Sequence, residues 1–230
     1  MLFKRTKFYK DFNPALDKGK LIILTKKLLP DMVFNMASLE GNPFTYPEVQ
    51  TLLEGITIGG HKLSDEQQVL RIRDGWNYIF EFVNKETLNL NKELFNSLNG
   101  IVAKDEALIS GIFRNGQVRI GGTEFLPPKA EELEIIFQEE LKTIIERNNS
   151  AIDLAFDIFL WGALNQFYYD GNKRTSRLVS NLVLIFNGQG IFNVKVKNRL
   201  EFNTLMVDFY NNKDGDKICD FFYDYCLERY

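Results

Sequence analysis

A nearly continuous apolar run close to residue 180 sets the strongest limit on how this chain can fold. The run extends from Leu178 to Phe186 and ends at Asn187-Gly188. A helix that is apolar on most of its surface must be covered on most sides by other elements. The run therefore predicts a central buried helix that reaches solvent only at its N-terminal end.

The segments around this run are also predicted to be helical. Thr45 and Glu48 have the spacing of a capping box, and the apolar run that follows them stops at Gly55. Further helices are predicted to begin at Ser64, with Gln67 as its capping partner, and at Glu131, Ser150, Asn198 and Asp216. Because no repeat or linker divides the chain, we expect a single all-α domain over residues 1–230.

One segment departs from the helical pattern. Apolar residues alternate around Asn115-Gly116 over residues 112–120, and Gly121-Gly122 follows. Alternation around an Asn-Gly pair is the strongest short-range signal for a β-hairpin. The sequence thus predicts a short hairpin flap that lies against the helices, with a free edge able to accept another extended chain.

Charge and cysteine content exclude several classes of protein. Lys and Arg number 28 and Asp and Glu number 31, for a net charge of -3, which argues against a nucleic-acid binder that depends on phosphate contacts. No stretch is long and apolar enough for a membrane span, and no secretory signal is evident. Cys219 and Cys226 would lie about 10 Å apart along one helix, too far for a disulfide. A cytoplasmic protein with buried thiols is expected.

Residues 166–177, ahead of the apolar run, have the chemistry of a phosphate site. The first N–H groups of a helix lack internal partners, and Gly171 would let the backbone approach an anion closely. Asn172 could donate its amide, and Arg174 and Arg177 would project from one helix face toward phosphate oxygens. Asp170 could hold Mg²⁺ between phosphates.

A simpler interpretation fits the same spacing equally well. An ordinary Asp-Gly turn could lead into a helix that carries solvent-exposed arginines. A Walker-type loop is excluded, since no Gly-Lys-Ser/Thr follows a strand.

The segment resembles the motif of the Fic family, His-Pro-Phe-x-Asp/Glu-Gly-Asn-Gly/Lys-Arg-x-x-Arg. Phe167 and Tyr168 replace the usual Pro and Phe, and Gln166 stands where the family has its catalytic His. The matching positions are Asp170, Gly171, Asn172, Lys173, Arg174 and Arg177.

The resemblance extends from about residue 30 to the end of the chain. Leu39-Glu40-Gly41-Asn42-Pro43 is similar to the family's inhibitory-helix signature, whose glutamate blocks the γ-phosphate site, although Met36 replaces the expected Ser or Thr. The resemblance implies a helical domain with a hairpin flap. Inhibitory and regulatory helices would occupy about residues 1–60, and the Fic core about 64–230.

The implied activity is transfer of AMP from ATP to a Ser, Thr or Tyr hydroxyl of a target protein, with Mg²⁺ as a cofactor. The resemblance implies these roles: Asp170 for Mg²⁺; Gly171, Asn172 and Lys173 for the anion hole; Arg174 for the β- and γ-phosphates; Arg177 for the γ-phosphate or Glu40; and the flap, with Val118, Arg119, Ile120 and Gly121, for docking of the target protein. The oligomeric state stays open, with a homo-oligomer as one alternative.

Gln166 limits this activity. A glutamine amide accepts no proton at useful pH, and loss of a general base typically slows a reaction by about 10²- to 10⁴-fold. His61, the single histidine, is expected in an exposed loop rather than as a substitute base. Tyr168 and Tyr169 are expected to pack in the core or line the pocket. Three interpretations follow: an impaired adenylyltransferase, a nucleotide-binding pseudoenzyme, or a hydrolase that removes AMP with Glu40 orienting water.

Overall fold

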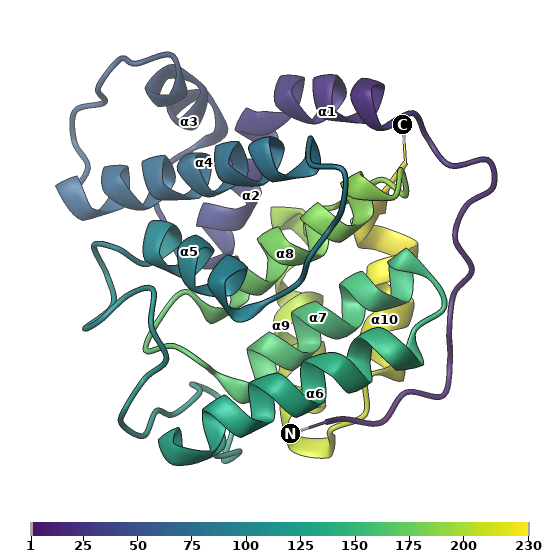
Figure 1. Cartoon of the computed structure of the whole chain (residues 1–230). Helices are drawn as coiled ribbons and strands as arrows, with labels where there is room; N and C mark the ends of the chain where they lie inside the picture. Colours follow the sequence, from purple (N-terminus) through teal and green to yellow (C-terminus); the bar gives the residue numbers. More distant parts are fainter. Residues whose placement is uncertain (1, 230) are drawn as a thin grey trace.

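The computed structural model describes residues 2–229 and is built almost entirely from helices (Figure 1). The α-helices of this part of the chain are α1 Lys18–Lys27, α2 Leu29–Leu39, α3 Tyr46–Leu53, α4 Leu63–Val83, α5 Lys92–Val102, α6 Leu133–Arg147, α7 Ala151–Asn165, α8 Asn172–Phe186, α9 Arg199–Asn212 and α10 Asp216–Phe221. Strand β1 Ile191–Phe192 pairs antiparallel with β2 Leu227–Glu228. The prediction of an all-α fold is confirmed. Within residues 2–229 no helix combines the length and apolarity needed to cross a bilayer.

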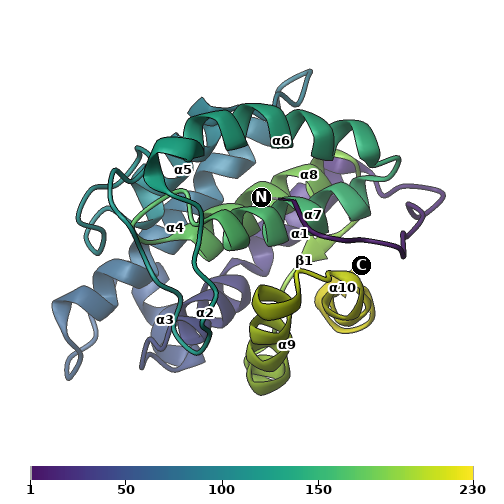
Figure 2. The ribbon, with the colours of Figure 1, turned by 90° about the horizontal axis from the view of Figure 1, so that it is seen from below.

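Helix α8 lies at the centre of the molecule, as the apolar run predicts. Helix α7 lies directly beside it, and α2, α4 and α5 are arranged on other sides, with α9 and α10 beyond α7 (Figures 1 and 2). The close approach of α7 to α8 depends on Gly162, because a Cβ at this position would lie 1.9 Å from Oγ of Ser176. The pairing of α7 with α8 positions the loop between them, which carries residues 166–171.

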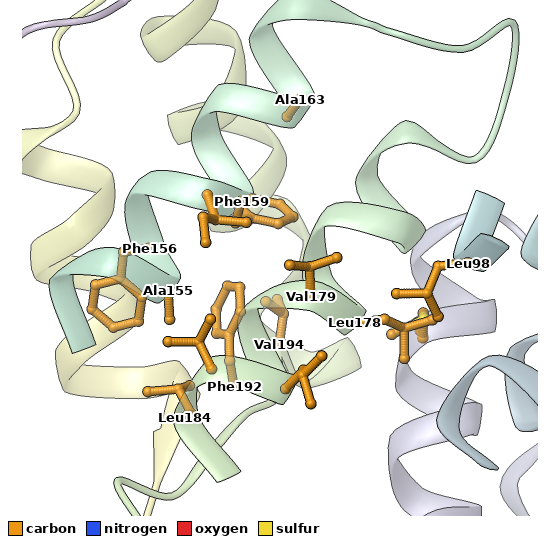
Figure 3. Close-up of a cluster of buried hydrophobic side chains, with 14 of the residues drawn as sticks. Leu98, Ala155, Phe156, Phe159, Ala163, Leu178, Val179, Leu184, Phe192 and Val194 are labelled. Atoms are coloured by element: carbon orange, nitrogen blue, oxygen red, sulfur yellow. The ribbon is translucent and has the colours of Figure 1, made fainter. Parts of the chain in front are cut away.

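Aromatic and aliphatic side chains fill the space around α8. Phe159 from α7, Val179 from α8 and Phe192 from β1 meet in this core (Figure 3), and each is fully buried. Full burial of such a side chain contributes roughly 1.5–3 kcal/mol. The polar segment at the start of α8 is therefore held by a rigid, well-packed support.

Predicted helix starts are mostly confirmed. Ser150 caps α7 by accepting a hydrogen bond from the backbone N–H of Asp153, and the Thr45–Glu48 capping box is present at α3. The predicted start of α4 at Ser64 is wrong. The last extended residue is Lys62, whose backbone N–H donates to Asp65 at 3.3 Å, so the helix begins before Ser64.

The prediction of a β-hairpin is wrong, because residues 112–122 form a loop without strand pairing. A type I′ turn needs positive φ at both central residues, yet neither Asn115 nor Gly116 has it. Arg114 instead donates its backbone N–H to the carbonyl of Phe167, at 2.9 Å, and Phe113 stacks on the Phe167 ring. Contacts with the α7–α8 loop thus replace the cross-strand ladder.

The side chain of Arg114 completes this anchoring. Its guanidinium is buried and donates to backbone carbonyls of Gln166, Gly116 and Pro128. The loop that was expected to be a hairpin flap with a free edge is therefore tied by one arginine to the segment that carries the motif.

Both cysteines are buried free thiols, as expected. Burial raises the pKa of Cys219 and of Cys226. The two thiols therefore stay protonated and behave as small apolar side chains.

Candidate nucleotide-binding site

A pocket of about 530 Å³ opens at the N-terminal end of α8. Its wall comes from the α7–α8 loop and first turn of α8, the end of α2, residues 119–121 and one face of α9. Of the predicted site residues it brings together Glu40, Arg119, Ile120, Gly121, Gln166, Asp170, Gly171, Asn172, Lys173 and Arg174. Val118 and Arg177 do not line it.

Gly171 makes the turn into α8 possible. Its φ of 74° lies in the left-handed region, and a Cβ there would come within 2.8 Å of the Ala103 side chain. Asn99 fixes the same turn by donating its amide to the carbonyl of Asp170, at 2.9 Å. The turn therefore presents the first backbone N–H groups of α8, which have no partner inside the helix, at the pocket wall.

The side chain of Asn172 does not serve the anion as expected. Its Nδ2 donates to the Tyr168 carbonyl (2.8 Å) and to Gln166 Oε1 (3.1 Å), while its Oδ1 accepts from the Tyr168 backbone N–H. With its amide donors used inside the loop, Asn172 closes the turn. Its backbone N–H is the group that remains for a phosphate.

Gln166 ends α7 in a left-handed conformation, with φ 49° and ψ 59°. Its Nε2 donates to the carbonyl of Ala163 at 2.7 Å, and its Oε1 accepts from Asn172. The side chain at the expected position of the catalytic base is thus held by hydrogen bonds and has no basic atom.

Arg174 is buried, with 2% of its surface exposed, and forms a two-point ion pair with Glu106. The pair joins Nη1 to Oε1 at 2.5 Å and Nη2 to Oε2 at 3.0 Å. Nη2 also reaches Oδ1 of Asp170 at 3.1 Å. Although burial opposes it, these carboxylates and Glu40 raise the pKa of Arg174.

Arg177 is equally buried, with 2% of its surface exposed, but its surroundings differ. Its guanidinium lies over the rings of Phe159 and Phe202, and its Nε and Nη2 have no hydrogen-bond partner. Burial lowers the pKa of Arg177 to about 10, against the opposing effect of Glu40. Because both arginines are buried, the interpretation of the segment as a turn with solvent-exposed arginines is wrong.

The prediction that Glu40 pairs with Arg177 is also wrong. Glu40 follows the last residue of α2, and its Oε1 lies 3.5 Å from Nζ of Lys173. No ion pair joins Glu40 to Arg177 among residues 2–229. The Glu40 carboxylate contacts Lys173, which is more exposed than Arg177. Glu40 therefore acts on Arg177 only through its charge.

Three contacts that shape the site escaped the sequence analysis. Glu106 lies in a polar stretch after α5 that looks like any solvated loop, and Arg114 lies within the predicted hairpin. Tyr168 is buried and donates its hydroxyl to Asn96 at 2.9 Å. No local pattern marks such partners, since each contact joins residues far apart in the chain.

Of the predictions for Tyr169 and His61, the first is confirmed and the second is wrong in part. Tyr169 lines the pocket and donates its hydroxyl to Asn115, as expected. His61 lies in the loop between α3 and α4, as expected, but its side chain is only 16% exposed. Its ring stacks on Phe44 and contacts Glu48 at 3.0 Å, so it belongs to the packing around α3.

The residues at the pocket fit a metal ion that is shared with phosphate. Both hydrogen bonds to the Asp170 carboxylate go to Oδ1, so Oδ2 is left to the pocket. Among residues 2–229 no cluster of three or more His, Cys, Asp or Glu side chains forms a ready metal cage. Mg²⁺ typically binds through one or two carboxylates together with substrate phosphates and water, which matches a single available carboxylate.

Known proteins resemble this chain in sequence. Residues 82–184 match the Fic/DOC family. The protein adenylyltransferase Fic of Aedes aegypti is 24% identical over 187 residues, which cover 77% of this chain and 35% of the relative. That of Drosophila grimshawi is 26% identical over 181 residues, covering 76% and 36%. The chain thus spans about a third of the length of these curated relatives.

Solved structures show the same fold. A Fic domain containing signaling protein from Bacteroides thetaiotaomicron superposes with a TM-score of 0.69 at 20% identity, covering 84% of this chain and 75% of that one. A Fic family protein from Desulfovibrio desulfuricans gives a TM-score of 0.70 at 15% identity, covering 94% and 73%. Residues 82–184 of the chain thus match the Fic/DOC family, and the chain has the fold of these Fic-domain structures.

Proposed function

We propose that this chain binds ATP with Mg²⁺ in the α8 pocket and is a protein adenylyltransferase of the Fic type, with a transfer step weakened by Gln166. The observation that carries this proposal is one pocket that joins a helix N-terminus, an available carboxylate on Asp170 and nearby buried arginines. The names of the curated relatives support it.

Each part of the site has a role in the proposed activity. Backbone N–H groups at residues 172–174 and the ammonium of Lys173 would bind phosphate oxygens. Asp170 would hold Mg²⁺, which supplies charge neutralisation between phosphates when bound. Residues 119–121 lie at the pocket wall, where the backbone of a target protein would dock.

Gln166 is the weak point of the transfer. The attacking hydroxyl of a target must lose a proton as it bonds to the α-phosphorus and pyrophosphate leaves, and no amide accepts that proton. Positioning and charge neutralisation do not need the base. We therefore expect slow transfer rather than none.

A nucleotide-binding pseudoenzyme is the second candidate. The observation that favours it is the hydrogen bonding of Gln166, whose amide is held by Ala163 and Asn172. In that case the nucleotide would control a partner protein instead of being consumed.

Calorimetric titration with Mg²⁺·ATP tests the binding step. Asp170→Asn should weaken binding by at least about tenfold, or 1.4 kcal/mol, since it removes the charge that holds the cation. Asp224→Asn changes an exposed acid outside the pocket and should leave the affinity unchanged. Equal affinities for the parent and Asp170→Asn would rule out the assignment.

Incubation with α-labelled ATP and cell lysate then separates the candidates. Labelling of protein that is lost in the Asp170→Asn variant supports AMP transfer. Binding without label supports the pseudoenzyme. Release of AMP from a previously modified protein, lost in Glu40→Gln, would instead support a hydrolase in which Glu40 orients water.

A further inference from the structure

The terminal nitrogens of Arg174 have no hydrogen left for a phosphate. Nη1 donates to the Val102 carbonyl (2.9 Å) and to Glu106, while Nη2 donates to Glu106 and to Asp170. A guanidinium carries two hydrogens on each terminal nitrogen, so these bonds use all of them. The single remaining donor, Nε, is buried without a partner.

Glu106 is built to keep this pairing. Its two oxygens face the two terminal nitrogens, the geometry in which a guanidinium and a carboxylate bind most strongly. Gln68, on α4, donates to Oε2 of Glu106 at 2.9 Å and so fixes the carboxylate from the other side. A phosphate that contacted Arg174 would have to break these bonds in a setting where only 2% of the arginine is exposed.

The far end of the same contact reaches Asp170. Arg174 Nη2 and the Gly171 backbone N–H both bind Oδ1 of Asp170. The side chain of Asp170 is itself 49% exposed, so without these bonds its carboxylate would rotate freely. Holding Oδ1 fixes the position of Oδ2 at the pocket.

We propose that Glu106 and Arg174 form a brace that positions the Asp170 carboxylate for a divalent cation, and that Arg174 does not bind nucleotide phosphate. Glu106 is then a positioning residue that acts through Arg174. This proposal rests on the proposed function for the presence of the metal, and it reassigns the role that the family resemblance gives to Arg174. The competing interpretation is that Glu106 blocks a phosphate-binding arginine.

The test is ATP binding by calorimetry, measured with Mg²⁺ and again with EDTA, for the parent, Glu106→Gln and Asp105→Asn. Asp105 is the matched control, because it is the neighbouring acid and also pairs with an arginine, Arg71 at 2.6 Å, outside the pocket. The brace predicts that Glu106→Gln lowers the gain in affinity from Mg²⁺ by about tenfold and changes affinity in EDTA less than twofold. Asp105→Asn should change neither.

Two further measurements keep the outcome decisive. Thermal unfolding without ligand shows whether Glu106→Gln is folded at the assay temperature. Should it not be, Arg174→Lys replaces it, since a lysine keeps the charge but not the two-point contact, and the same loss of the Mg²⁺ gain is expected. Binding of Mn²⁺ alone, followed by electron paramagnetic resonance, should also weaken in the variant.

The results that would overturn the proposal are distinct from failure of the proposed function. Tighter ATP binding by Glu106→Gln in both conditions would show a blocking acid. An unchanged Mg²⁺ gain would show a purely structural pair. If the parent binds no ATP, the proposed function fails, and the Mn²⁺ measurement alone decides the brace. No binding of Mn²⁺ by the parent in that case overturns the brace as well.

Discussion

Helix α8 carries two buried arginines on different sides, and their hydrogen bonding differs. On the side of α5 and the loop after it, Arg174 has carboxylates or carbonyls on both terminal nitrogens. On the side of α7 and α9, Arg177 lies between aromatic rings, and two of its nitrogens have no partner. Both side chains are 2% exposed.

The difference shows that burial alone does not reveal the role of an arginine side chain. A guanidinium whose terminal nitrogens are all paired serves to hold its neighbours in place. Unpaired donors in a dry environment cost free energy, and they attract an anion that would satisfy them. The Arg174 side is thus structural, and the Arg177 side is poised to respond to the charge of Glu40 or of a ligand.

The largest effect is expected from restoring a base while removing the acid near Arg177. Gln166→His combined with Glu40→Gly should raise AMP transfer by at least about 10²-fold, the lower end of general-base contributions. Histidine suits this backbone, because it is enriched among residues with positive φ. The measurement is protein labelling by α-labelled ATP.

Asp170→Ala in the same background is the control for that experiment. A double variant that binds ATP but stays as inactive as this control would show that more than a base is missing. The pseudoenzyme would then be the better description.

Arg174→Met should give the next largest effect, on stability. It leaves the carboxylates of Glu106 and Asp170 without their cation, and loss of one partner from a buried ion pair costs several kcal/mol. Since Glu106 is 24% exposed, we expect a loss of about 2 kcal/mol in urea unfolding. Arg71→Met, which removes a partly exposed pair, should cost less than about 1 kcal/mol. Equal losses would erase the contrast between buried and exposed pairs.

Glu40→Gly should tighten Mg²⁺·ATP binding by about tenfold, because it frees Lys173 and removes a negative charge beside Arg177. Glu54→Gly is a matched control. Glu54 also ends a helix and precedes a glycine with positive φ, but it is exposed and outside the pocket. Calorimetry that gives unchanged or weaker binding for Glu40→Gly would contradict an inhibitory role.

Arg177→Met is expected to have the smallest effect on stability, with the opposite sign to Arg174→Met. Removing buried donors that lack partners should leave stability unchanged or raise it by about 1 kcal/mol. ATP affinity should fall, because the unpaired donors near the pocket are lost. Urea unfolding and calorimetry on one preparation check both. A destabilisation as large as that of Arg174→Met would mean that Arg177 has a structural partner after all.

Local chemistry made much of the site predictable. The buried α8, the capping residues at α3 and α7 and the phosphate-type turn at Gly171 follow from patterns a few residues long. The prediction of a hairpin at residues 112–122 was wrong because it also rested on a local pattern alone. Its Asn-Gly signal is local, but Arg114 and Phe113 find better partners in the α7–α8 loop.

The sequence by itself determined the helical fold and the residue types at the start of α8, because helix periodicity and turn chemistry act between near neighbours. Only the tertiary structure decided which charges meet. Glu106 binds Arg174 across 68 positions of sequence, and Glu40 reaches Lys173 rather than Arg177. Such pairings depend on how whole helices pack, since side chains that are distant in sequence meet only where the fold brings their backbones together.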